Sequence, residues 1–223
     1  MAGTLRFPTV LFDLDGTLTD PRVGITRGVQ HALATVGIVV DDPDSLVAYI
    51  GPPIHDGLVE QHGVAVADID PAVAEYRRYY REQGMYENVL YDGVPELLAE
   101  LVGAGAVLAV ATSKPQEVAV AILEHFEIAS WFAFVGGASL DGRRRAKADV
   151  IDHTLASLGP AAGARSATVL VGDRMHDIAG AQATGIASIG VRWGYAPPGE
   201  LEAAGAGEIV ASVDELRVAL LGS

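Results

Sequence analysis

Two aspartates close to the amino terminus have the types and spacing for chemistry at phosphorus. Asp13 and Asp15 follow a short apolar run, and on extended backbone side chains two positions apart point the same way. Such close carboxylates resist joint ionisation unless a cation lies between them. One carboxylate can attack phosphorus and form an aspartyl-phosphate, while a neighbour can protonate the leaving oxygen and then activate water. Taken alone, the pair is compatible with covalent phosphoryl chemistry assisted by a cation, and equally with two solvated acids at the end of a strand.

Other polar residues follow later apolar runs of the chain. Thr112 and Ser113 end one run, and Lys147 opens the helical pattern that follows another. Asp173 ends a further run, with Asp177 one helical turn beyond it. In open α/β sheets, ligands bind beyond the carboxyl ends of the strands. We therefore expect these side chains to converge on one edge of a sheet.

Such a convergence would assemble a metal site and its counter-charges. Asp173 would add a third carboxylate to Asp13 and Asp15, and hard oxygen ligands of this kind suit Mg²⁺. The transferred phosphoryl group carries spread negative charge, which Mg²⁺, Lys147 and hydroxyl or backbone donors would stabilise.

The elements that must position these residues are short and apolar. Five runs without strict alternation are predicted as strands buried on both faces. They span residues 9–12, 107–111, 132–135, 168–171 and 187–191. The helical patterns that separate them span residues 95–101, 116–125, 146–158 and 177–184. This alternation predicts an α/β fold, with a parallel sheet covered by helices on both faces.

One segment interrupts the alternation. Residues 21–88 contain no strong strand pattern, but they do contain helical patterns at 25–36, 53–62 and 71–83. We therefore expect two domains, a catalytic core of residues 1–20 and 89–223 and an inserted helical domain of residues 21–88.

The composition excludes several classes of function. The net charge of −14 repels nucleic acid and anionic membranes, so we expect neither as a partner. The absence of cysteine excludes disulfides and thiolate chemistry. With no signal-peptide pattern and no apolar run long enough to cross a membrane, we expect a cytoplasmic protein. The same charge repels a phosphate substrate, so local cations are needed, and the only lysines are Lys114 and Lys147.

The candidate residues, in this order, resemble the four motifs of the haloacid dehalogenase-like hydrolase superfamily. The run Asp13–Leu18 resembles the first motif, D-x-D-G-T-L. Thr112–Ser113 resembles the second motif, and Lys147 matches the third. The run Gly172–Asp177 resembles the fourth, G-D-x-x-x-D. Four motifs spread in order over nearly the whole chain make the resemblance specific.

The resemblance implies a Rossmann-like core in which Asp13 is the nucleophile and Asp15 is the acid and base. It implies that Mg²⁺ is held by Asp13, the backbone carbonyl of Asp15 and Asp173. Asp177 would bind the ion through water or orient the site. The helical insert would be a type 1 cap, a mobile lid that carries substrate specificity and excludes water.

Within the superfamily, the chain is most similar to the phosphoglycolate phosphatase-like and bacterial 5′-nucleotidase-like branch. The segments that carry this likeness are 49–53, 84–88, 112–115, 139–142, 172–174 and 193–195. Dehalogenases lack the second aspartate, which is Asp15 here. The phosphonate-cleaving branch needs a cap lysine, which residues 21–88 lack, and the mutase branch needs a cap histidine where Ile25 stands. Hydrolysis of a small phosphorylated metabolite is therefore the implied activity.

Several assignments stay open at this level. Either Thr112 or Ser113 can supply a phosphate-binding hydroxyl, and Gly51 and His55 of the cap are candidate substrate contacts. A phosphotransferase or sugar-phosphate mutase, or a catalytically idle binding protein, is the alternative function. The sequence carries no signal for the oligomeric state, and it does not specify which phosphate ester is the substrate.

Overall fold

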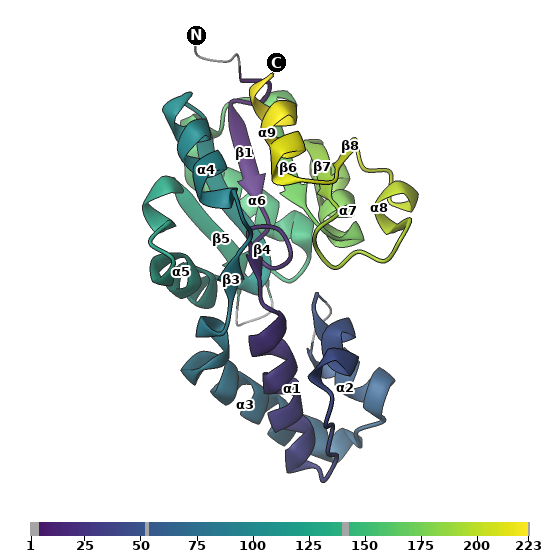
Figure 1. Cartoon of the computed structure of the whole chain (residues 1–223). Helices are drawn as coiled ribbons and strands as arrows, with labels where there is room; N and C mark the ends of the chain where they lie inside the picture. Colours follow the sequence, from purple (N-terminus) through teal and green to yellow (C-terminus); the bar gives the residue numbers. More distant parts are fainter. Residues whose placement is uncertain (1–4, 52–53, 140–142, 223) are drawn as a thin grey trace. The chain divides into compact units, whose positions relative to one another are not determined.

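The computed structural model describes residues 5–51, 54–139 and 143–222 (Figure 1). The chain divides into two compact units. The first comprises Met1–Thr19 and Leu90–Ser223, and the second comprises Asp20–Val89. No helix in the described ranges is both long and apolar enough to cross a membrane.

A six-stranded sheet organises the first unit, and all its neighbouring strands pair in parallel. The strands are β1 (Thr9–Phe12), β4 (Val107–Pro115), β5 (Phe134–Ala138), β6 (Thr168–Gly172), β7 (Ala187–Val191) and β8 (Glu208–Val210). Their spatial order is β5-β4-β1-β6-β7-β8, so the direction of strand addition reverses at β1. This order is that of a Rossmann sheet, and the crevice for ligands lies where the order reverses. The predicted α/β fold with a parallel Rossmann-like sheet is confirmed.

Helices cover both faces of this sheet. On one face, α6 (Lys147–Leu158) and α7 (Met175–Thr184) pack against each other and against the central strands. On the opposite face, α4 (Val94–Gly103) and α9 (Val213–Leu221) contact each other in front of the sheet in Figure 1. The remaining helices are α5 (Gln116–His125) and the short α8 (Glu200–Ala203). Short 3-10 segments occur at Ala129–Trp131, Gly159–Ala162 and Arg165–Ala167.

The core beneath α6 and α7 explains why the strands are so apolar. Leu11 of β1 lies in register between Ala109 of β4 and Leu170 of β6. These three residues are fully buried, together with Val150 and Ile151 of α6. Strands that are buried on both faces must be apolar at nearly every position, which removes the alternation typical of an exposed sheet. The core therefore fixes the strand ends from which the polar residues emerge.

The second unit is built from helices, as the sequence predicts. Its elements are α1 (Arg22–Thr35), α2 (Ile54–His62), α3 (Val66–Glu82) and 3-10 segments at Pro43–Tyr49 and Gly84–Tyr86. A two-stranded sheet of β2 (Thr19–Asp20) and β3 (Val89–Leu90) forms where the chain crosses between the units. Helix α1 packs closely against α3, with Gly28 against the Tyr76 ring, and against the 3-10 segment at Gly84–Tyr86, with Gly24 against the backbone of Gly84.

Several boundaries differ from those expected. Helix α3 begins at Val66 and contains Pro71, whereas the expected helix began at the proline. Strand β5 starts at Phe134, two residues later than expected. Strand β4 continues to Pro115, so Thr112 and Ser113 belong to the strand. Its last residues are held because Thr112 and Pro115 pair with β5.

Strand β8 and helix α9 were not predicted. Helix α9 carries a recognisable start signal, because the Ser212 side chain accepts a hydrogen bond from Glu215 N and the Glu215 carboxylate accepts one from Ala211 N. This exchange is a variant of the capping arrangement of the form S-x-x-E. Strand β8 has only three residues, which is too short for a periodic signal.

Gly24→Ala should destabilise the protein although alanine favours helices. An added Cβ would lie 1.9 Å from the carbonyl oxygen of Gly84, and both partners are backbone, so no side chain can move aside. We expect the overpacking cost of about 1–3 kcal/mol to exceed the helix-propensity gain of about 1 kcal/mol. Urea unfolding measures the difference.

Gly103→Ala in α4 is the matched control. Beyond its own helical backbone and chain neighbours, no atom of the described residues lies within 4 Å of its added Cβ, so this variant should be neutral or more stable by about 0.5–1 kcal/mol. Equal unfolding free energies for the two variants would contradict the packing argument.

Candidate active site

Three buried aspartates meet at the carboxyl edge of the sheet. Asp13 follows β1, Asp173 follows β6, and Asp177 lies in the first turn of α7. One side-chain oxygen from each lies within 4.8 Å of the others. The Asp13 backbone N–H donates to Val171 O at 2.9 Å, which ties the end of β1 to the end of β6. The structure therefore brings together the residues that the first and fourth motifs contribute.

Lys147 supplies the positive charge of this cluster. It is the first residue of α6, and only 6% of its surface is exposed. Its Nζ lies 2.9 Å from Asp13 Oδ1 and 2.6 Å from Asp177 Oδ1, and it donates to the Ala111 carbonyl at 3.1 Å. Burial by itself lowers the pKa of Lys147, but the Asp13 and Asp177 carboxylates outweigh it and raise that pKa above its ordinary value. The ammonium therefore stays charged.

Asp15 is paired with the other lysine of the chain. Lys114 Nζ lies 2.7 Å from Asp15 Oδ2. Burial raises the pKa of Asp15 above its ordinary value, while the Lys114 ammonium opposes the rise. A carboxyl with a raised pKa is suited to give a proton and to take one back. Among the described residues, the group of carboxylates that could hold a metal ion does not include the Asp15 side chain, so the two acids of the first motif have different surroundings.

The two candidate hydroxyls lie in different environments. Thr112 is 2% exposed, and its Oγ1 accepts a hydrogen bond from Lys114 N at 3.3 Å. Ser113 is an exposed residue of β4. Because Thr112 Oγ1 accepts this hydrogen bond, its own hydroxyl proton remains available for donation to another group.

The acidic cluster has the chemistry of a divalent cation site. Burial first, and then the Asp177 and Asp13 carboxylates, raises the pKa of Asp173 well above its ordinary value. Asp173 Oδ1 is buried and has no hydrogen-bond partner in the described residues. A buried carboxylate without a partner is costly, and a cation would remove that cost. The donors are oxygen atoms, as hard cations prefer.

Two glycines leave room around Asp173. Gly16 has a φ of +78°, and a Cβ on it would lie 2.2 Å from Asp173 Oδ2. A Cβ on Gly194 would lie 2.4 Å from the same oxygen and 2.5 Å from the Gly16 carbonyl oxygen. No residue larger than glycine fits at either position. Together with the buried Asp173 Oδ1 and the oxygen donors of the cluster, this close packing fits a site for a metal ion.

The loop after β7 is part of this site, which the sequence argument did not predict. Tyr195 N donates to Asp173 Oδ2 at 2.7 Å, and Trp193 Nε1 donates to the Thr17 carbonyl at 3.1 Å. The loop thus holds the fourth motif through Asp173 and the first motif through Thr17. The bond from Tyr195 uses its backbone, so no residue type signals it. Glycine at position 194 is the one sequence feature that could have indicated a close approach.

The candidate substrate residues of the helical insert lie in the second unit. Gly51 has a φ of +106°, and His55 is an exposed residue of α2 whose Nδ1 lies 3.2 Å from Asp56 Oδ1. Two segments of the family resemblance reach beyond the described residues, at 52–53 and at 140–142.

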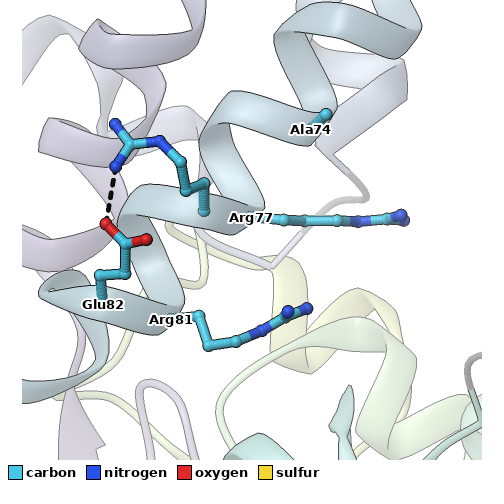
Figure 2. A pocket seen from close by; sticks show the side chains of 5 residues that line it. Ala74, Arg77, Arg81 and Glu82 are labelled. Carbon is cyan, nitrogen blue, oxygen red and sulfur yellow. Dashed lines mark hydrogen bonds and ion pairs between the residues drawn. The ribbon is translucent and has the colours of Figure 1, made fainter.

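A hollow of about 320 Å³ in the second unit lies along α3 (Figure 2). It is lined by Ala74, Arg77, Arg78, Arg81 and Glu82. Because all five residues belong to one helix, the hollow is a surface depression, and it contains none of the candidate catalytic residues.

Comparison with known proteins agrees with this architecture. A family model described as haloacid dehalogenase-like hydrolase matches residues 10–191. A 5′-nucleotidase of Pseudomonas aeruginosa is 48% identical over 201 residues, which are 89% of each chain. A phosphoglycolate phosphatase of Agrobacterium fabrum is 31% identical over 87% of this chain and 85% of its own.

A third relative is named as a kinase and not as a phosphatase or nucleotidase. The tyrosine-protein kinase PtkA of Mycobacterium tuberculosis is 42% identical over 95% of this chain and 72% of its own. Its solved structure superposes with a TM-score of 0.84 and covers 97% of this chain and 99% of that one.

These matches define the class of protein. The chain belongs to the haloacid dehalogenase-like hydrolase family. Within that family it is a phosphatase, as the motifs indicate. The predicted family resemblance is confirmed.

Asp173→Asn should weaken the binding of Mg²⁺ without lowering the stability of the metal-free protein. Mg²⁺ at about 100 times its dissociation constant adds about 2.7 kcal/mol to the folded state, which raises the unfolding temperature of a chain of this size by about 5–10 °C. The variant lacks one of three crowded carboxylates and should lose most of this rise. In EDTA the unfolding temperature of the variant should be no lower than that of the wild type, because the repulsion among the three carboxylates is reduced. Differential scanning calorimetry measures both.

Glu117→Gln is the control for this experiment. Glu117 is an exposed residue of α5, and its variant should keep the full rise with Mg²⁺. A rise of equal size in the wild type and in Asp173→Asn would contradict the metal site.

Proposed function

We infer that this protein hydrolyses a small phosphate monoester, with Mg²⁺ as cofactor and Asp13 as the nucleophile. The observation that carries the proposal is the cluster of Asp13, Asp173 and Asp177, with Lys147 against Asp13 and Asp177. Its members are the nucleophile, metal-ligand and cation positions of the family resemblance, and they meet at the point where the strand order reverses.

The chain's own residues account for both steps of the reaction. In the first step an oxygen of Asp13 bonds to phosphorus, the bond to the leaving oxygen breaks, and the leaving oxygen takes the proton of Asp15. In the second step a water oxygen bonds to phosphorus while the Asp15 carboxylate takes a water proton. The Asp13–phosphorus bond then breaks, and Asp13 returns as a carboxylate.

The other members of the site position and stabilise the phosphoryl group. Lys147 keeps its charge beside Asp13 Oδ1, and it neutralises part of the charge that gathers near the nucleophile. The Thr112 hydroxyl donates to a phosphoryl oxygen. Asp13, the Asp15 carbonyl and Asp173 would hold Mg²⁺, with Asp177 orienting the site. When bound, the ion acts as a Lewis acid toward the phosphoryl oxygens.

The substrate class is a small phosphorylated metabolite. Two relatives are named as a 5′-nucleotidase and a phosphoglycolate phosphatase, and both names describe phosphate monoesterases. The second unit, residues 20–89, would act as the cap that selects the ester, with Gly51 and His55 as candidate contacts. A panel of phosphorylated metabolites, assayed with Mg²⁺ for kcat/KM, identifies the preferred ester.

Phosphoryl transfer to an acceptor other than water is the second candidate function. The relative named as a tyrosine-protein kinase matches 95% of this chain, and an aspartyl-phosphate can in principle pass to a hydroxyl acceptor. The partition of product between inorganic phosphate and a phosphorylated acceptor separates the two functions. Ile25 stands where the mutase branch uses a histidine, which favours hydrolysis.

Asp13→Asn should abolish the Mg²⁺-dependent hydrolysis of 4-nitrophenyl phosphate, with a loss of at least about 1,000-fold. The amide keeps the shape of the side chain but is not a nucleophile. Release of nitrophenolate measures the rate. Asp152→Asn changes an exposed carboxylate of α6 that bonds Arg165, and this control should stay active. Full activity in Asp13→Asn would overturn the mechanism.

Thr112→Val and Ser113→Ala should differ in their effects on the same reaction. Thr112 is buried near the carboxyl end of β4, and removal of one donor to the transferred group costs about 100-fold in kcat. Ser113 is exposed, so its variant should stay within about 3-fold of the wild type. Steady-state kinetics with Mg²⁺ compares them, and the reverse order would assign the phosphate-binding hydroxyl to Ser113.

A further inference from the structure

Both lysines of this acidic chain lie in the candidate active site, and only one of them has a role so far. Lys147 occupies the position of the third motif. Lys114 matches none of the four motifs, yet its side chain is only 7% exposed and its Nζ lies 2.7 Å from Asp15 Oδ2. A buried ammonium pays a large desolvation cost, and ion pairs of this kind are weak contributors to stability. The pairing therefore calls for a functional explanation.

The backbone around Lys114 is shaped to bring its side chain to Asp15. The pairing of β4 with β5 shifts register between Thr112 and Pro115. Within this irregular stretch, Lys114 N donates to Thr112 Oγ1 at 3.3 Å. Gly137 of β5 lies against it, and a Cβ there would be 2.6 Å from the Lys114 carbonyl oxygen. The extra length of β4 thus places a second lysine beside the first motif.

This contact distinguishes the two oxygens of Asp15. Oδ2 lies against the Lys114 ammonium, whereas Oδ1 is buried and has no hydrogen-bond partner among the residues that the structure describes. The neighbouring acid has a different partner, because Asp13 Oδ1 lies 2.9 Å from Lys147. The two lysines therefore hold the two acids of the first motif separately.

We propose that Lys114 is a positioning residue that holds Asp15 through Oδ2, so that Oδ1 exchanges protons with the leaving oxygen and with water. The proposal rests on the proposed function. Oδ1 gives its proton to the leaving oxygen as the bond between phosphorus and that oxygen breaks. Oδ1 then takes a proton from the water whose oxygen bonds to phosphorus. Lys114 neither gains nor loses a proton in either step.

Lys114→Met tests the first step through its dependence on the leaving group. An alkyl alkoxide is a poor leaving group and needs the proton, while 4-nitrophenolate leaves without it. For the alkyl phosphate that the wild type hydrolyses fastest, kcat/KM should fall by about 100-fold, since positioned proton transfer contributes about 10²–10⁴-fold. For 4-nitrophenyl phosphate, kcat/KM should change by less than about 3-fold.

The second step gives an independent signature with 4-nitrophenyl phosphate. Hydrolysis of the aspartyl-phosphate still needs Asp15 as a base, so kcat should fall by about 100-fold although kcat/KM is kept. KM should fall in parallel, and stopped-flow mixing should show a burst of one nitrophenolate per active site. A variant with a merely loosened structure would lose kcat/KM for both esters equally.

Three further variants complete the experiment. Lys114→Arg keeps the charge and should recover most of the alkyl phosphatase activity. Lys114→Gln is polar and should reproduce the kinetic pattern of Lys114→Met if the apolar variant does not fold. Adding Lys114→Met to Asp15→Asn should cause no further loss, because both changes act through the same carboxyl group. The stabilisation by Mg²⁺ should persist in every variant.

Several outcomes overturn the proposal. An equal loss for both esters, or additive losses in the double variant, would show that Lys114 does not act through Asp15. A raised KM with unchanged kcat would instead make Lys114 a substrate contact. In both cases the wild type is still active, so the proposed function stands. A wild type that hydrolyses no ester of the panel removes the proposed function and the role of Lys114 together.

Discussion

The mutual repulsion of Asp13, Asp173 and Asp177 is the constraint on which the rest of the first unit depends. Their oxygen atoms lie within 4.8 Å of one another in a buried site, where like charges interact strongly. Lys147 offsets part of this repulsion from the start of α6, at 2.9 Å from Asp13 and 2.6 Å from Asp177. Asp173 has no such partner for Oδ1 among the described residues. The arrangement is therefore complete only with a second positive charge next to Asp173.

Close packing of backbone against these charged groups is the second condition. A Cβ on Gly172 would lie 2.3 Å from Asp177 Cγ, and a Cβ on Gly180 would lie 2.6 Å from Lys147 Cγ. Glycine at position 172 lets β6 lie close to Asp177, and glycine at position 180 lets α7 lie close to Lys147. The apolar strands then seal the site from beneath, which keeps the local dielectric constant low.

The sequence predicted the sheet because buried strands depend on residue type. From it we expected the carboxylates of Asp13, Asp15 and Asp173 to share a cation, whereas the cluster in the structure comprises Asp13, Asp173 and Asp177. Buried strands require runs of apolar residues, and aspartates that follow such runs can be identified directly in the sequence. The contact of the loop after β7 was not predicted because Tyr195 donates to Asp173 through its backbone N–H, a group that every residue except proline has. The pairing of Lys114 with Asp15 was not predicted because Lys114 lies at the register shift in the pairing of β4 with β5, and such a shift is not visible in the local sequence. Proximity that arises from tertiary pairing leaves no local pattern.

The charges of the site also determine what it can bind. With all four aspartates ionised, two lysines leave the site with a charge of about −2, and the chain as a whole carries −14. A phosphate monoester dianion is repelled by such a site, at close range most of all. One divalent cation brings the local charge to about zero, and a proton on Asp15 makes it positive. Under the proposed function, metal binding would therefore be a condition for holding the substrate as well as for the chemistry. In that mechanism, the same acids that would accelerate the reaction with the ion bound would oppose substrate binding without it.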